Sequence, residues 1–164
     1  MRELVPFVSI GVVALLIIAG CGVYTLNPKG KSNYKTIAIE PLDNKTSQFG
    51  LTDQLTQIIV DAFIADATLK VVSSSNADVI LVGTLTNYQR VASTFDQSDK
   101  VLEYKVLLDF DISLRNGKDN SEIWKETMNQ EGIYNANTET EEDGQKRAGQ
   151  RLVQAILTKT TKSW

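Results

Sequence analysis

The chain has 164 residues, with 17 Lys and Arg against 20 Asp and Glu, one cysteine and no histidine. A net charge of −3 without a polybasic block argues against nucleic acid as a partner. One cysteine excludes an internal disulfide, and the absence of histidine removes the usual proton shuttle and metal ligand at neutral pH. Most metal, nucleophile and proton-shuttle chemistry is thereby removed, and we expect no catalytic residues, metal site or cofactor.

An apolar run over residues 4–20 ends directly at Cys21. The run is short for a spanning helix, which needs about 20 residues, and small residues precede the cysteine, as in a secretory signal. Ile18-Ala19-Gly20-Cys21 is similar to the lipobox of bacterial lipoproteins. We expect residues 1–20 to be a lipoprotein signal peptide and Cys21 to carry acyl chains, with an uncleaved anchor as the alternative. Two or three acyl chains attach a protein to a membrane permanently.

Residues 21–33 are rich in Gly, Pro, Lys and Asn and predict a short linker, which extends at most about 40 Å. Residues 34–164 have the usual size of one domain. Within them, the alternation of Ile37 and Ile39 predicts a strand that Pro41 ends, followed by a loop over residues 43–47. Gly22, rather than Asp, follows Cys21, which by similarity to such signals indicates the outer membrane.

A period of 3.6 begins at Leu51, with apolar residues on one side as far as Phe63, and predicts an amphipathic helix. Its polar side is acidic, so we expect it to pack on a core rather than on a membrane surface. A short apolar piece over residues 69–72 precedes a strand over residues 77–88. The polar segment from Ser93 to Lys100 is predicted to be a turn.

Residues 102–114 alternate strictly between apolar and polar and predict a half-solvated antiparallel strand. Asn116-Gly117 is typical of a hairpin, and residues 123–131 return as the next strand. Thr138 and Glu141 have the spacing of a capping box before a final helix, whose apolar stripe includes Leu152 and Ile156. The order predicts an α+β two-layer sandwich: two helices on one face of a four-stranded, possibly five-stranded, mostly antiparallel sheet.

Two patterns suggest chemistry at first sight. Gly30-Lys31-Ser32 matches the end of a phosphate-binding loop, but Thr25 stands where the required earlier glycine would be. Asp109 and Asp111 share one face of a strand and have the spacing of an acid/base pair. No nucleophile or pocket-forming motif accompanies them, so a solvated sheet face is the favoured interpretation.

Several short motifs occur in a fixed order between residues 21 and 160. They are Cys21-Gly22 with Tyr24 and Leu26, the segment from Ile37 to Thr46, Ala77-Asp78, the segment from Ala92 to Phe95, Glu103-Tyr104, and Ile123-Trp124. In this order they resemble the lipopolysaccharide-assembly lipoprotein family, LptE. The resemblance implies a non-enzymatic subunit that plugs the outer-membrane β-barrel LptD and helps to insert lipopolysaccharide into the outer leaflet.

The resemblance also suggests contacts with lipopolysaccharide or with the partner at Arg90, Phe95, Lys100 and Lys105. Enterobacterial members carry a basic residue after the hairpin phenylalanine, where this chain has Asp96. We therefore expect the turn to dock on the barrel rather than bind the glycolipid directly. The alternative is an outer-membrane lipoprotein regulator of a peptidoglycan synthase, but residues 22–33 are too short for the long spacer of such activators.

Overall fold

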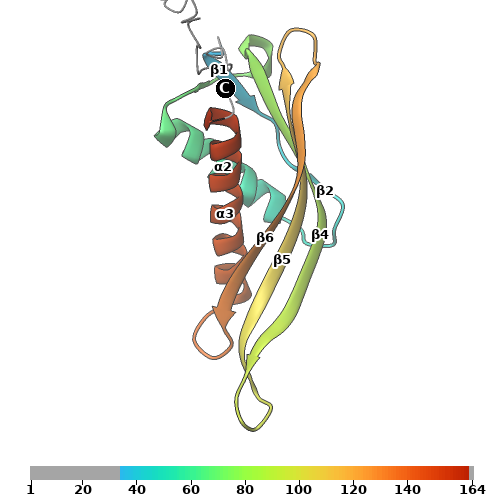
Figure 1. Cartoon of the computed structure of the whole chain (residues 1–164), viewed down its shortest axis with the longest axis vertical. Coiled ribbons are helices and arrows are strands. Elements are labelled where there is room, and N and C mark those ends of the chain that lie inside the picture. The colour runs from blue at the N-terminus through green and yellow to red at the C-terminus, as the bar shows by residue number, and fades with distance from the viewer. Residues whose placement is uncertain (1–33, 163–164) are drawn as a thin grey trace, which may run out of the picture. The chain divides into compact units, whose positions relative to one another are not determined.

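The computed structural model describes residues 34–162, so Cys21, the expected signal peptide and the whole predicted linker lie outside the described residues. The elements follow the order strand, helix, strands, helix, and the expected α+β fold class is confirmed (Figure 1). They are β1 Thr36–Ile39, β2 Asp43–Asn44, α2 Leu51–Asp66, β3 Lys70–Val71, a 3₁₀ turn Ser74–Asn76, β4 Val79–Phe95, β5 Val101–Asn116, β6 Glu122–Asn135 and α3 Glu141–Lys162.

The strands form one mixed sheet in the order β3-β1-β4-β5-β6, with β2 also beside β4. The long strands β4, β5 and β6 form an antiparallel meander, whereas the three short pairings that involve β1, β2 and β3 are parallel. The described sheet has six strands, more than the four or five expected. One reason is that Asp43 and Asn44, predicted to lie in a loop, pair with Thr84 and Leu85 of β4.

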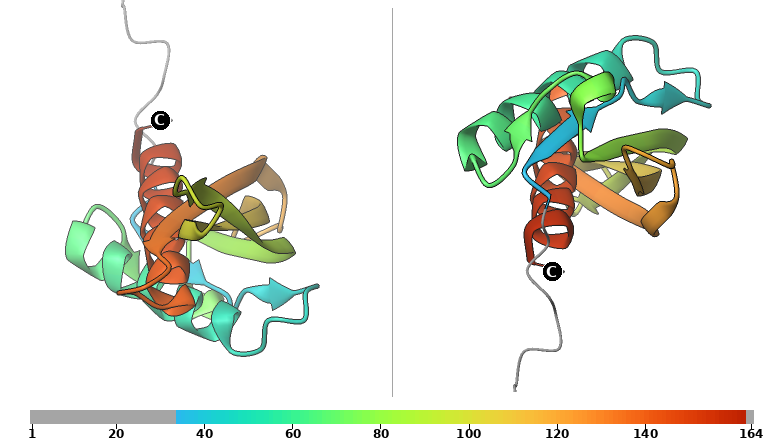
Figure 2. Two further views of the ribbon diagram at one scale, coloured as in Figure 1. Left: turned by 90° about the horizontal axis from the view of Figure 1, so that it is seen from below. Right: turned by 90° about the horizontal axis from the view of Figure 1, so that it is seen from above.

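Both helices cover the same face of the sheet, as the two views of Figure 2 show. The apolar side of β5 faces them, and the alternation predicted for residues 102–114 is confirmed over its second half. The side chains that meet in this core are fully buried, which is where apolar burial stabilises the fold. They include Val106, Leu108, Phe110, Ile112 and Leu114 from β5, Leu55, Ile59 and Phe63 from α2, and Leu152 and Ile156 from α3.

Two boundaries differ from the sequence prediction. The turn expected from Ser93 to Lys100 is shorter, because β4 continues to Phe95 and pairs Thr94 with Glu103 and Phe95 with Val101. Strand β6 likewise continues to Asn135 rather than ending near Glu131. The β4 extension is exposed, so backbone hydrogen bonds rather than apolar side chains define it. The β6 extension does reach the core through Tyr134, but Gly132 takes the buried position before it and interrupts the apolar alternation.

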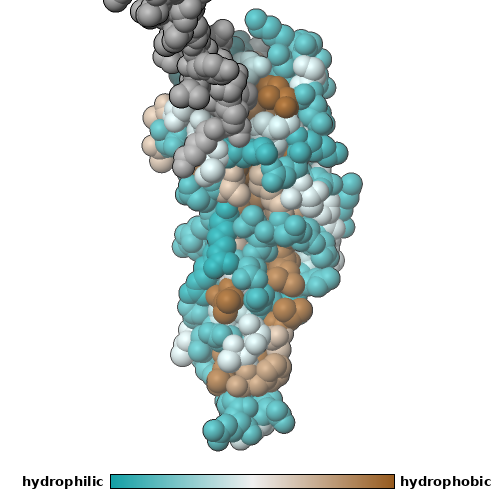
Figure 3. Space-filling model, in the orientation of Figure 1, coloured by the Kyte–Doolittle hydropathy of each residue, from teal (hydrophilic) through white to brown (hydrophobic). Residues whose placement is uncertain are grey.

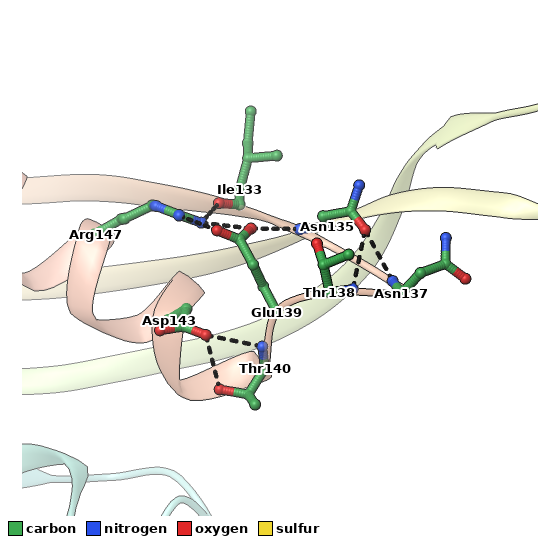
Figure 4. A network of polar contacts seen from close by, with 8 residues as sticks. All are labelled: Ile133, Asn135, Asn137, Thr138, Glu139, Thr140, Asp143 and Arg147. Atoms are coloured by element: carbon green, nitrogen blue, oxygen red, sulfur yellow. Dashed lines mark hydrogen bonds and ion pairs between the residues drawn. The ribbon is translucent and has the colours of Figure 1, made fainter.

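The cap of α3 lies two residues later than the predicted capping box (Figure 4). Thr140 donates its N–H and its hydroxyl to the Asp143 carboxylate, at 2.9 and 3.1 Å, and the Asp143 N–H donates to the Thr140 carbonyl at 3.2 Å. The Asp143 carboxylate thus satisfies the Thr140 N–H, which is one half of a capping box, whereas the Asp143 N–H is bonded to the backbone of Thr140 rather than to its hydroxyl. The predicted pair of Thr138 and Glu141 is wrong, because the Thr138 N–H instead donates to the side chain of Asn135 in the preceding turn.

Glu139 connects the turn between β6 and α3 to helix α3. Its carboxylate accepts the Asn135 N–H at 2.7 Å and forms an ion pair with Arg147, which also donates to the Ile133 carbonyl of β6 (Figure 4). The Arg147 hydrogen bonds, followed by the one from Asn135, lower the pKa of Glu139 to about 2. The carboxylate therefore stays ionised, and keeps its partners, in mildly acidic solution.

Helix α3 approaches β6 through glycines. A Cβ added to Gly132 would lie 1.9 Å from the carbonyl oxygen of Gly144, and one added to Gly144 would lie 2.7 Å from the Tyr134 ring. Farther along α3, a Cβ on Gly149 would lie 2.5 Å from Leu55 of α2. Backbone-to-backbone contact therefore sets the distance between α3 and the sheet.

We expect Gly132→Ala to lower the free energy of unfolding by more than about 2 kcal/mol, because the opposing atom is backbone and has no rotamer in which to move aside. Urea denaturation followed by circular dichroism measures this loss. Gln150→Ala, at an exposed position of α3, is the control and should change stability by less than about 0.5 kcal/mol. Equal effects of the two substitutions would contradict the close approach.

Candidate interaction surface

The sheet face opposite the helices carries rows of polar side chains, and hydrogen bonds link these side chains across the strands. Asp109 of β5 accepts hydrogen bonds from Asn87 of β4 and Asn129 of β6, and Asp111 accepts one from Thr127 at 2.8 Å. The two carboxylates considered as an acid/base pair are thus held by amide and hydroxyl groups of neighbouring strands. This arrangement stabilises a solvated sheet face, which we call the open face.

Charged pairs extend the open face toward the β4–β5 hairpin. Lys105 of β5 lies 2.9 Å from Glu131 of β6, and its hydrogen bond lowers the pKa of Glu131. Thr94 donates to Glu103 at 2.7 Å, close to the end of the hairpin. Lys105, one of the predicted contact residues, is therefore on the open face and already paired.

Two hollows indent the open face. One, of about 490 Å³, lies over the row of Asn87, Asp109 and Asn129. The other, of about 280 Å³, is lined by charged side chains of both signs, including Asp43, Arg115 and Lys125. A hydrophilic and indented face of this kind suits a wet contact with a polar partner surface.

Arg90, the second predicted cation, lies on the other face of the sheet, among aromatic side chains. Its guanidinium carbon is 3.8 Å from the centre of the Tyr104 ring, and its Nε is 3.6 Å from the Glu141 carboxylate. Tyr104 in turn stacks on Tyr134, with ring centres 5.6 Å apart. Arg90 thus joins the sheet to the first turn of α3.

Tyr88 completes this cluster and was not identified from the sequence. Its hydroxyl donates to Glu141 and accepts from the Gln145 side chain at 2.9 Å. Burial, followed by the hydrogen bond to Glu141, raises the pKa of Tyr88. Its place on the helix-side face follows from a bulge between Leu85 and Asn87, which reverses the alternation of β4. Hydrophobic periodicity gives no sign of that reversal.

The β4–β5 hairpin projects past the first turn of α3 (Figure 1). In its turn, the Asp96 side chain accepts the N–H groups of Ser98 and Lys100, at 2.7 and 3.0 Å, so the aspartate closes the turn. Phe95 beside it is 53% exposed. Figure 3 shows the end of this hairpin as hydrophilic, with apolar side chains gathered above it.

The four predicted contact residues do not form one cluster. Arg90 lies on the helix-side face, Lys105 on the open face, and Phe95 and Lys100 at the hairpin end. Within residues 34–162, no group of three or more His, Cys, Asp or Glu has an arrangement that could hold a metal ion. The same part of the chain contains no helix long and apolar enough to cross a membrane.

Comparison with known proteins identifies the family. A sequence model of the lipopolysaccharide-assembly family LptE matches residues 34–160. The chain belongs to the LptE family. The resemblance expected from the ordered motifs is thereby confirmed, and the match covers nearly all of the described domain. No sequence relative was found among curated proteins.

Solved structures share the fold of this LptE-family domain. A hypothetical protein of Chlamydia trachomatis is similar with a TM-score of 0.57 and 10% identity, over 77% of this chain and 95% of that one. A protein of Xanthomonas campestris is similar with a TM-score of 0.58 and 10% identity, over 81% of this chain and 90% of that one. A minor lipoprotein of Acinetobacter baumannii is similar with a TM-score of 0.52 and 18% identity, over 79% of this chain and 94% of that one. At these identities the similarity concerns the fold alone.

In this LptE-family domain we expect Arg90→Ala to lower the free energy of unfolding by about 1 kcal/mol, because it removes both the contact with Tyr104 and the ion pair with Glu141. Lys100→Ala is the control at the hairpin end, where no ion pair to the lysine is formed within residues 34–162, and should change stability by less than about 0.5 kcal/mol. Urea denaturation compares the two. A larger loss for Lys100→Ala would show that the roles of the two cations are reversed.

Proposed function

We propose that this protein is a non-enzymatic, outer-membrane lipoprotein subunit of the lipopolysaccharide transport machinery. In this proposal the domain plugs and supports an LptD-type β-barrel that inserts lipopolysaccharide into the outer leaflet. The observation that carries the proposal is the family match over residues 34–160, which spans the sheet, both helices and the projecting hairpin. The domain then faces the periplasm or lies inside the barrel lumen.

The open face is the surface that fits such a lumen. Lumens of outer-membrane barrels are polar, and a plug must present polar groups to them without losing its own core. The rows of Asp109 and Asp111, with their amide and hydroxyl partners, provide such groups on a rigid sheet. The helix-side face is occupied by the core, so the open face remains for the barrel.

We place a barrel contact, rather than a lipopolysaccharide contact, at the hairpin end. Asp96 and Asp99 lie there with Lys100 as the single cation of the turn, so an anionic glycolipid meets more repulsion than attraction. Asp96 also has a structural task in closing the turn. The exposed Phe95 supplies apolar area for a protein contact.

Acylation of Cys21 anchors the domain in this proposal. We expect Cys21→Ala to abolish acylation and to leave an unprocessed or mislocalised precursor, because the cysteine sulfur is the atom that carries the first acyl-bearing group. Mass spectrometry of the mature amino terminus provides the measurement. An unmodified Cys21, or a mature chain that begins at another residue, would contradict the lipid anchor.

The barrel partner can be tested with a charge reversal on the open face. We expect the full-length protein, purified from detergent-solubilised outer membranes, to bring down a large β-barrel, and Lys105→Glu to reduce its recovery at least about fivefold. Lys118→Glu makes the same charge change on the exposed β5–β6 turn and should leave recovery unchanged. Thermal unfolding of both variants verifies that the domain is folded.

The same purification tests the alternative assignment. A peptidoglycan synthase recovered in place of a barrel would contradict the proposed function and support a regulator of cell-wall synthesis. Equal recovery of the barrel with both variants would move the contact away from the open face.

A further inference from the structure

Strand β6 is the last strand of the sheet, so one row of its backbone groups faces away from β5. The side chains of α3 show which row this is. Arg151 donates to the carbonyl of Glu131 at 3.0 Å, and Arg147 donates to the carbonyl of Ile133. The backbone N–H and C=O groups of the odd-numbered residues of β6 therefore face away from β5. Because these groups alternate along a strand, those of Thr127 and Asn129 face away from β5 too.

Hydrogen bonds occupy the outward backbone groups of β6 only at the C-terminal end of the strand. Arg151 and Arg147 occupy the carbonyls of Glu131 and Ile133, and the Asn135 N–H donates to Glu139. Within residues 34–162, no group pairs with the outward N–H and C=O of Thr127 and Asn129. An open strand edge is a template for another strand, and native proteins usually block it with proline, a bulge or a covering segment. Residues 125–130 contain no proline and no bulge, and Lys125 and Glu126 are the charged residues of this stretch.

A groove of about 710 Å³ runs along this open stretch, between β6 and α3. Met128 and its neighbours form one side, and Arg151, Ala155 and Lys159 of α3 form the other. Lys159 lies 2.8 Å from Glu126, and Arg151 lies 3.5 Å from Glu131. The charged residues that line the groove are Arg151, Lys159 and Glu126, so the lining is net positive on a chain whose net charge is negative.

The position of α3 restricts what enters this groove. Because its arginines reach the outward carbonyls, α3 lies over β6 itself. Two copies of β6 paired edge to edge would be about 4.8 Å apart, whereas packed helices need about 8–10 Å between their axes. A second copy would bring its own α3 into collision with the first. The groove therefore suits an extended segment that carries no helix on that face.

We propose that residues 125–130 of β6 bind, by strand addition, a short extended segment of a partner protein whose side chains facing α3 are acidic. Main-chain hydrogen bonds to Thr127 and Asn129 supply the affinity, and the cations Arg151 and Lys159 select the charge. This inference goes beyond the proposed function, because it holds for any partner that presents such a segment. Failure to recover a barrel leaves it standing.

The probe is an acetylated, amidated hexapeptide, Thr-Glu-Val-Glu-Thr-Glu, which presents glutamates on one side of a strand. Added to the full-length protein in detergent micelles, it should slow amide hydrogen exchange at Thr127 and Asn129. The same peptide with lysine in place of glutamate should bind at least about tenfold more weakly. N-methylation of one alternate set of peptide amides should abolish binding, whereas N-methylation of the other set should be tolerated.

The protein variants form a matched pair. Asn129→Pro removes an outward N–H, which a proline on an edge strand permits, and should abolish binding. Asn129→Ala removes the same side chain but keeps the N–H, and should bind the peptide. If Asn129→Pro does not fold, the N-methylated peptides make the same test on the unaltered protein.

Three results would overturn the proposal. Unchanged exchange at Thr127 and Asn129 with saturating peptide would show that the edge does not add a strand. Equal binding of the lysine peptide would remove the selection for acidic segments. Protection of the edge that rises with the concentration of the protein alone would identify a second copy as the occupant.

Discussion

The contact between Gly132 and Gly144 determines how the layers of this domain fit together. With no side chain between them, the backbone of α3 rests on the backbone of β6, closer than any larger residue permits. At that distance Arg147 and Arg151 reach around the strand and bind its outward carbonyls. The helix therefore both buries one face of the sheet and covers part of its edge, and the uncovered remainder is the groove beside Met128.

The period of two in β5 divides the domain between stability and recognition. Residues such as Leu108 and Phe110 are fully buried, while the intervening Asp109 and Asp111 hold the polar rows of the open face. Because each strand position belongs to one face only, polar residues are added to the open face without loss of core. The proposed role as a plug requires this separation, since the surface of a plug must match a polar lumen while its core remains dry.

The sequence predicted the features that depend on long apolar periods. Both helices, the order of the elements and the buried face of β5 follow from such patterns, and the ordered motifs identified the family. Features set by single backbone events were not predictable. The bulge after Leu85 places Tyr88 and Arg90 on the helix side, and Asn135 closes a turn that moves the helix cap to Thr140. The sequence analysis grouped Arg90 with Lys105 as contact residues, but the residue inserted at this bulge places the two cations on opposite faces of the sheet.

The order in which the strands join the sheet has a consequence for how the chain folds. From β4 to α3, each element packs against the one that precedes it, so residues 79–162 assemble through contacts between neighbours in the sequence. The parallel pairing of β1 with β4 instead joins residues about 40 positions apart, across the intervening helix α2. Loop closure makes such distant pairings slow and local ones fast. We therefore expect the C-terminal meander and its helix to form first, and the N-terminal strand, which follows the expected membrane anchor in the sequence, to be added last.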